Sequence, residues 1–264
     1  MLLSQRQHEL DAAAPAHLQR MRVTLGDGAE TTVHVASYPL ATTRLRVERL
    51  PGPMTLEQWC AAEGVQEALV GGFYIRQPQT PADPLLSGMP LGQLRARGEV
   101  HASVAFDAPW DARRACVQVS ASGEVQIARR DQLPELLDGE LLQAGPLLVS
   151  GGQPASYEDE GFSAGAGQFD SDITAGRHPR AALGRDERRL LAVACDGRTE
   201  DEAGLTLDEL AQTLLELGAD AALNLDGGGS TSLVCGGRLR NVPREGDGVA
   251  LVGGRPIATA LAFA

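Results

Sequence analysis

Eight residues in the C-terminal half of the chain combine a carboxylate, hydroxyl groups and an unusually adaptable backbone. Residues 224–231 read Asn-Leu-Asp-Gly-Gly-Gly-Ser-Thr. Consecutive N–H groups in a glycine turn can form an anion-binding concavity, and Asp226 would place a carboxylate beside it. A plain glycine turn capped by Asp226 is the simpler alternative, whereas a P-loop is disfavoured because no Lys follows the glycines. The candidate ligand-binding residues of this segment are Asn224, Gly227, Gly228, Gly229, Ser230 and Thr231.

Two apolar runs predict the strands that position these groups. Residues 190–195 form a continuous apolar stretch that ends at Asp196, and residues 221–225 lead into Asp226. Runs of this length bounded by turn residues are typical of buried strands. A carboxylate is therefore expected at the end of each strand.

The remaining elements are short strands joined by turns, with a few helices. Strands are predicted at 31–36, 44–48, 68–70, 104–106, 115–119, 124–128, 147–149 and 257–263. Helices are predicted at 55–64, 133–137 and 206–218, and the first and last of these helices begin at capping boxes. Residues 76–99 and 151–177 are predicted loops, and His34 is expected on the exposed face of its strand. Such a pattern favours an α+β fold with a mixed or antiparallel sheet. We expect one compact domain at 21–264 after a polar extension at 1–20 that is helical or frayed.

Several segments in a fixed order resemble the phosphodiester glycosidase family. Besides residues 224–231, they are 71–73 (Gly-Gly-Phe), 145–149 (Gly-Pro-Leu-Leu-Val), 178–184 (His-Pro-Arg-Ala-Ala-Leu-Gly), 196–198 (Asp-Gly-Arg), 240–241 (Arg-Asn) and 255–256 (Arg-Pro). The resemblance covers roughly residues 65–264 and is strongest over 178–234. Several motifs in the family's order are more specific than any single one.

The resemblance implies a hydrolase that cleaves the glycosidic bond of a sugar-1-phosphodiester, such as one of N-acetylglucosamine, without a cofactor. Glycoside hydrolysis passes through an oxocarbenium-like state and usually employs two carboxyl groups. Arg180 and Arg198 are the candidates for binding phosphate, because a guanidinium makes bidentate contacts to phosphate oxygens. Asp196 and Asp226 would orient water or stabilise the sugar cation, and His178 would act as acid or base. Gly71 and Gly72 are added to the substrate-binding set.

Each of these side chains also has a structural interpretation. Arg180 or Arg198 would form surface ion pairs, Asp196 would cap a turn, and His178 would face solvent. The enzymatic hypothesis requires the chain segments bearing Arg180, Asp196 and Asp226 to converge on one cavity at the glycine turn.

Two other functions fit parts of the sequence. Val70 stands where the family usually has Asn, which keeps open a non-catalytic module that binds sugar phosphates or glycans. Residues 161–165 match the Gly-x-Ser-x-Gly pattern of serine hydrolases, with Ser163 as nucleophile. The acidic and glycine-rich flanks do not supply the strand and helix that this pattern needs. Asp170 and Asp172 lie in the same segment, and Asp247 lies in another loop. Acidic residues in such loops are usually solvated, so no metal site is predicted, and a structural cation is the alternative.

Composition and charge exclude some partners. The net charge of −12 and pI near 4.9 disfavour nucleic acid and anionic membranes, although a local basic pocket for a small anion is compatible with them. No apolar stretch is long enough to span a bilayer, and the N-terminus has no secretory apolar core, so a cytoplasmic location is predicted. The four cysteines, Cys60, Cys116, Cys195 and Cys235, show no CxxC spacing and are expected to be buried thiols.

Overall fold

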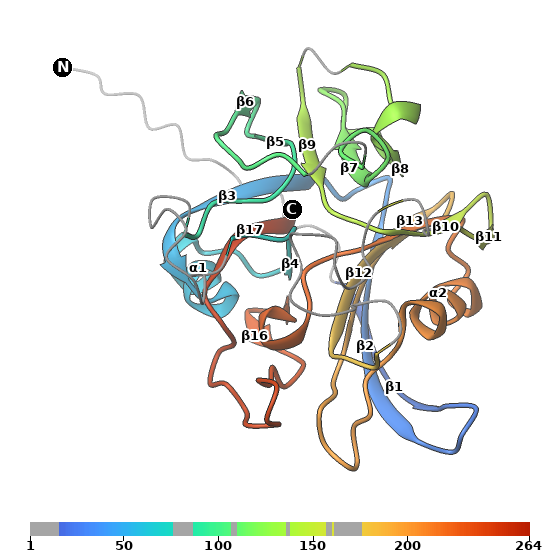
Figure 1. Cartoon of the computed structure of the whole chain (residues 1–264). Helices are drawn as coiled ribbons and strands as arrows, with labels where there is room; N and C mark the ends of the chain where they lie inside the picture. The colour runs from blue at the N-terminus through green and yellow to red at the C-terminus, as the bar shows by residue number, and fades with distance from the viewer. Residues whose placement is uncertain (1–15, 76–86, 107–109, 136–137, 157–159, 161–175) are drawn as a thin grey trace.

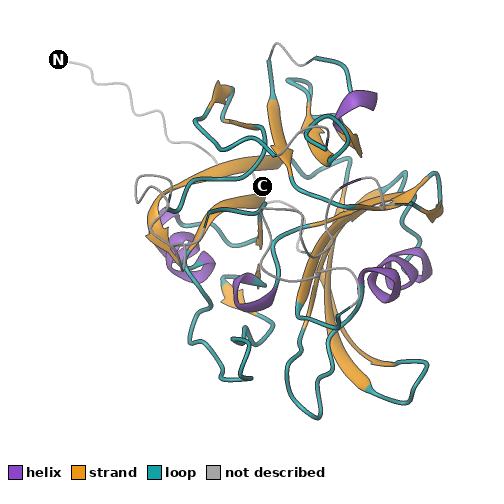
Figure 2. Cartoon of the chain, viewed as in Figure 1, coloured by secondary structure: helices purple, strands orange, loops and turns teal. Residues whose placement is uncertain are grey.

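The computed structural model describes residues 16–75, 87–106, 110–135, 138–156, 160 and 176–264. Within these ranges the chain forms three sheets and two α-helices (Figures 1 and 2). Every pairing between the named strands is antiparallel. The fold is therefore rich in sheet, and helix contributes less than the predicted α+β class suggests.

The largest sheet has seven strands in the order β1-β2-β13-β12-β14-β10-β11. Their bounds are His17–Thr24 (β1), Glu30–Pro39 (β2), Arg189–Cys195 (β13), Arg180–Arg185 (β12), Ala221–Asn224 (β14), Leu147–Ser150 (β10) and Gln153–Pro154 (β11). In the register of the central strands, Arg180 lies opposite Cys195 and Ala182 lies opposite Asn224. The beginning of β12 and the ends of β13 and β14 therefore meet at one edge of this sheet.

Two five-stranded sheets complete the structure. One has the order β16 (Arg238–Leu239), β15 (Leu233–Cys235), β4 (Ala68–Val70), β17 (Ile257–Phe263) and β3 (Leu45–Met54). The other has the order β6 (Glu99–Val100), β5 (Leu94–Ala96), β9 (Glu140–Gln143), β7 (Ala115–Val119) and β8 (Val125–Arg129). Single 3-10 turns lie at Arg130–Gln132 and Gly228–Ser230.

Both α-helices begin at the capping boxes that the sequence predicted. In α1 (Leu56–Glu63) the side chains of Thr55 and Gln58 each accept a hydrogen bond from the other's backbone N–H. Thr206 and Glu209 do the same in α2 (Leu207–Glu216). Reciprocal bonds of this kind satisfy two of the N–H groups that a helix start leaves unpaired.

The apolar core is shared among the sheets and the helices. Leu183, Leu190 and Leu223 of the seven-stranded sheet belong to the same buried cluster as Trp59 of α1 and Leu261 of β17. The apolar face of α2 packs on the other side of the seven-stranded sheet, next to residues of β13. All four cysteines are buried and free, as predicted. No helix in the described ranges is long and apolar enough to cross a membrane.

Several local predictions are wrong. Residues 17–20 belong to β1 and are not part of a helical or frayed extension. Val104 forms a single bridge with Leu91 instead of starting a strand. Leu133 follows a 3-10 turn where a helix was expected, and short strands interrupt the predicted loop at 94–100. The division into a terminal extension and one domain otherwise stays a prediction.

Candidate active site

Three chain segments meet at the edge where β12 begins and β13 and β14 end. The N–H of Gly228 donates to the carbonyl of Pro179 at 2.9 Å, which joins the turn after β14 to the start of β12. The N–H of Asp226 donates to Gly71 at 3.0 Å, which joins the same turn to the end of β4. The backbone segments that carry Arg180, Asp196 and Asp226 thus lie next to one another, whereas the convergence of these side chains on one cavity stays a prediction.

Two arginine side chains pack against the glycine turn. A Cβ at Gly228 would lie 3.0 Å from Nη2 of Arg198, and one at Gly229 would lie 2.8 Å from Nη2 of Arg255. Gly228 also has a φ of +61°, which side chains other than glycine rarely adopt. Glycine is required here both for the backbone angle and for the close approach of the guanidinium groups.

Arg198 and Arg255 are each fixed by a further contact. Nη1 of Arg198 donates to the carbonyl of Arg244 at 2.7 Å. The guanidinium of Arg255 pairs with both carboxylate oxygens of Glu245, with Nε 3.0 Å from Oε1. Glu245 offsets part of the positive charge, and the rigid planar guanidinium groups keep a defined orientation at the turn.

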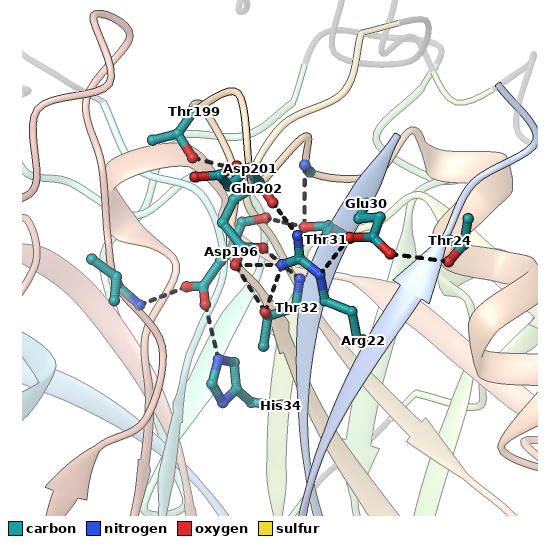
Figure 3. Close-up of polar contacts among 12 residues, drawn as sticks. Arg22, Thr24, Glu30, Thr31, Thr32, His34, Asp196, Thr199, Asp201 and Glu202 are labelled. Carbon is teal, nitrogen blue, oxygen red and sulfur yellow. Dashed lines mark hydrogen bonds and ion pairs between the residues drawn. The ribbon is translucent and has the colours of Figure 1, made fainter. Parts of the chain in front are cut away.

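Asp196 is buried, and both oxygens of its side chain are hydrogen-bonded. Oδ2 lies 3.0 Å from Nε2 of His34, and Oδ1 accepts from the N–H of Val242 at 2.6 Å. His34 is only 7% exposed and Asp196 only 5%, so the expectation of a solvent-facing His34 is wrong. Nearly all of β2 is covered on both faces, so alternation did not mark an exposed face. Figure 3 shows the imidazole of His34 directed at the Asp196 carboxylate.

The loop after Asp196 is attached to the start of β2. Glu202 accepts hydrogen bonds from the N–H of Thr32 at 2.6 Å, from its hydroxyl at 2.8 Å and from Arg22 at 2.7 Å (Figure 3). The Thr31 hydroxyl donates to the carbonyl of Asp196 at 2.9 Å. Because Arg198 belongs to the same loop, these contacts also fix the backbone that carries its guanidinium.

Arg180 and His178 flank Pro179, whose carbonyl accepts the N–H of Gly228. Arg180 is 3% exposed, and its guanidinium donates to the carbonyls of Leu205 at 2.9 Å and Gly176 at 2.8 Å. Part of its hydrogen-bonding capacity therefore holds neighbouring backbone in place. Burial, together with the charges of Arg180 and Arg198, lowers the pKa of His178 to about 4. His178 is thus neutral at neutral pH and accepts or donates without carrying charge.

Several residues predicted to bind substrate are buried or hydrogen-bonded within the protein, and their role in binding stays a prediction. Ser230 and Thr231 are fully buried, and their side-chain hydroxyls have no hydrogen-bond partner among the described residues. The Asn224 side chain donates to Gly145 and Leu225 beneath the turn. Backbone N–H groups of this set also make internal contacts: Gly72 donates to Thr259, Gly227 to Asp226, Gly228 to Pro179, Ser230 to Gly227 and Thr231 to Gly228.

These contacts change the expected anion cradle. Of the predicted N–H groups, those of Gly227 and Gly228 are already engaged within the protein. An anion at the turn would therefore rely chiefly on the guanidinium groups of Arg198 and Arg255. Gly71 remains at the site through its carbonyl, and its backbone packs against Thr259.

Sequence reasoning missed His34, Arg255 and Glu245. The Arg255-Pro256 pair lies in one of the motif segments, which was the available signal for Arg255. The ion pair between Glu245 and Arg255 and the burial of His34 can be recognised only in the folded chain.

Ser163, Asp170 and Asp172 lie outside the described residues. Within the described ranges, no group of three His, Cys, Asp or Glu residues is arranged to hold a metal ion.

Residues 63–264 match the phosphodiester glycosidase family, and the chain belongs to that family. The N-acetylglucosamine-1-phosphodiester alpha-N-acetylglucosaminidase of Bos taurus is 27% identical over 248 residues, which cover 89% of this chain and 42% of the relative. The Homo sapiens protein of that name is 32% identical over 106 residues, 40% of this chain and 20% of the relative. The chain thus spans less than half the length of these relatives.

Solved structures share the fold. The catalytic domain of the zebrafish N-acetylglucosamine-1-phosphodiester alpha-N-acetylglucosaminidase, auto-inhibited by its pro-peptide, superimposes with a TM-score of 0.70 at 20% identity, covering 97% of this chain and 85% of that chain. A putative exported protein from Burkholderia pseudomallei K96243 gives a TM-score of 0.66 at 17% identity, covering 89% and 74%. At these identities the likeness concerns the fold alone.

Proposed function

We propose that this chain hydrolyses the glycosidic bond of a sugar-1-phosphodiester, with N-acetylglucosamine as the first sugar to test. Water adds to the anomeric carbon, the bond from that carbon to the phosphate oxygen breaks, and the phosphate leaves with the electron pair as a monoester. The observation that carries the proposal is the packing of Arg198 and Arg255 against the glycine turn beside Asp226. Membership of the phosphodiester glycosidase family supports it.

The arrangement of charges suits a phosphate leaving group. A phosphate monoester leaves without strong protonation, so the main requirement is to stabilise the negative charge that develops on it. Arg198 and Arg255 lie at the turn to do this, and their guanidinium geometry matches phosphate oxygens. Asp226, directly before the turn, is the candidate for orienting water or stabilising the sugar cation.

Asp196 and His178 have narrower roles in this mechanism. Because both oxygens of Asp196 are hydrogen-bonded and the group is buried, its carboxyl group is held in a fixed orientation at the end of β13. His178 is neutral at neutral pH, so it serves as a hydrogen-bonding group or a base and not as a stored acid. A cytoplasmic location remains a prediction of the sequence.

The second candidate is a module that binds sugar phosphates or glycans without hydrolysis. Val70 is fully buried in β4 immediately before Gly71, where the family usually has Asn. A valine offers no polar group to substrate at this position. Binding of a sugar phosphodiester without turnover is the outcome that would favour this alternative.

Product analysis separates these functions. The chain is incubated with UDP-N-acetylglucosamine and with the methyl phosphodiester of N-acetylglucosamine, and products are identified by mass spectrometry. Glycosidic cleavage yields free sugar with UDP or methyl phosphate. Sugar-1-phosphate among the products indicates a phosphodiesterase, and products lost on Ser163→Ala but retained by Asp226→Asn indicate the serine hydrolase.

A further inference from the structure

A cavity lies beside Arg255, and none of the residues predicted for catalysis lines it. Its volume is about 620 Å³, and its walls include Arg49, Tyr74, Ile75, Arg255 and Ile257. This volume is in the range of pockets that hold a small organic ligand. Arg255 belongs both to this cavity and to the turn, because its guanidinium packs against Gly229.

The strands β3, β17 and β4 provide a second connection between the cavity and the turn (Figure 1). Arg49 of β3 lies opposite Thr259 of β17 in the register. Thr259 accepts the N–H of Gly72 through its hydroxyl and the N–H of Gly71 through its carbonyl. The carbonyl of Gly71 then accepts the N–H of Asp226. The cavity therefore adjoins the candidate active site through a rigid, hydrogen-bonded wall.

Arg49 is a half-buried cation without a carboxylate partner among the described residues. Its Nη1 donates to the carbonyls of Leu50 at 2.8 Å and Ala258 at 3.0 Å, and no carboxylate in the described part of the chain balances its charge. The neighbouring acid, Glu48, instead pairs with Arg97 at 2.8 Å. In a chain with a net charge of −12, a guanidinium that lines a cavity and has no described carboxylate partner points to an anionic ligand.

Arg255 is a weaker candidate than Arg49 for pairing with an anionic ligand in the cavity. Its guanidinium is held by both oxygens of Glu245, so the positive charge that remains available in the cavity is mainly that of Arg49. Pro53, Ile75 and Ile257 add apolar surface to the same cavity. Apolar walls with one convergent charged group are typical of a specific small-molecule site.

We propose that this cavity binds the leaving-group half of the substrate and that Arg49 pairs with a second anionic group on it, such as the distal phosphate of a nucleoside diphosphate. This inference rests on the proposed function, because it assigns a binding site to the phosphate-bearing leaving group of that reaction. It narrows the substrate class to sugar-1-phosphodiesters whose leaving group carries an additional negative charge. The bond that breaks is still the one between the anomeric carbon and the phosphate oxygen.

The test compares two diesters of N-acetylglucosamine that differ in the leaving group. For Arg49→Met, which keeps the aliphatic stem and removes the charge, we expect the ratio of kcat/KM for the UDP diester to that for the methyl diester to fall about tenfold or more. Arg46→Met, at an exposed position of the same strand, is the matched control and should preserve the ratio. An equal loss for both diesters would overturn the proposal.

A binding measurement separates this inference from the proposed function. Calorimetry with UDP and with uridine needs no turnover, so it gives a result even if the chain proves inactive. We expect UDP to bind wild type at least about tenfold more tightly than Arg49→Met, and uridine to show no such difference. Arg49→Gln keeps a donor for the Leu50 and Ala258 carbonyls and serves if Arg49→Met does not fold. UDP binding that is equal in wild type and in these variants would refute an anion site at Arg49.

Discussion

Nε2 of His34 lies 3.0 Å from Oδ2 of Asp196, across the two neighbouring strands β2 and β13. Both side chains are buried, so this contact is shielded from water and fixes the orientation of the carboxylate. His34 does not need to touch substrate to affect the reaction, because it acts on the position of Asp196.

Replacing His34 tests this positioning role. His34→Leu should destabilise the fold by about 1–3 kcal/mol, since a buried carboxylate loses a hydrogen-bond donor, and should lower kcat more than it raises KM. His34→Gln, which restores an amide donor, should recover part of the loss. Urea unfolding and steady-state kinetics measure both effects. His17→Leu, at an exposed position of β1, is the control. Full activity in His34→Leu would show that the contact is irrelevant to the reaction.

Glu202 attaches the loop that carries Arg198 to β2. Glu202→Ala removes the acceptor for the Thr32 backbone, its hydroxyl and Arg22, so Arg198 should be held less firmly at the turn. We expect KM to rise several-fold with a stability loss of about 1 kcal/mol. Kinetics of the matched variant Glu200→Ala, an exposed carboxylate in the same loop, should match wild type. Identical KM values for the two variants would contradict a role for this attachment.

The glycine turn should not tolerate a side chain. Gly228→Ala imposes a Cβ on a φ of +61° and brings it within 3.0 Å of Arg198. The backbone strain costs about 1–2 kcal/mol, and displacement of the guanidinium should lower kcat/KM by about tenfold or more. Gly246→Ala is the control, because nothing lies within 4 Å of its added methyl group. Comparable activity in these two variants would argue against the packing of Arg198 on the turn.

Stability should depend on pH through His178. Its pKa is about 4 in the folded chain against an ordinary value of 6.5. As pH falls from 6.5 toward 4, the unfolded chain takes up a proton that the folded chain does not, so the free energy of unfolding decreases. The contribution of His178 to the free energy of unfolding is fully present above pH 6.5 and should be absent in His178→Gln. Urea titrations between pH 4 and 7.5 measure it, and parallel curves for wild type and variant would disprove the lowered pKa.

Local signals in the sequence were sufficient to predict some helices and strands but not others. Both helix starts were predictable because Thr55 with Gln58, and Thr206 with Glu209, form capping boxes within four residues. Strand β12 was missed because it begins and ends with arginine and contains a glycine. Its central position comes only from pairing with β13 and β14.

The same holds for the candidate site: features set by adjacent residues were predictable, and contacts between distant segments were not. The glycine turn and the carboxylates at two strand ends were predicted from adjacent residues, and the backbone segments that carry them meet as expected. Neither the burial of Ser230 and Thr231 nor the contact of Arg255 with Gly229 follows from spacing, because both result from packing between distant segments. The orientation of His34 likewise depends on β2 being covered on both faces.

The most direct test of the central claim is hydrolysis of the methyl phosphodiester of N-acetylglucosamine in ¹⁸O-labelled water. We predict unlabelled methyl phosphate as the product, because water attacks carbon and not phosphorus. We further predict a loss in kcat of about 100-fold or more in Asp226→Asn, while Asp220→Asn, at the opposite end of β14, stays active. Label in the phosphate product, or an Asp226→Asn variant as active as wild type, would contradict glycosidic cleavage at this turn.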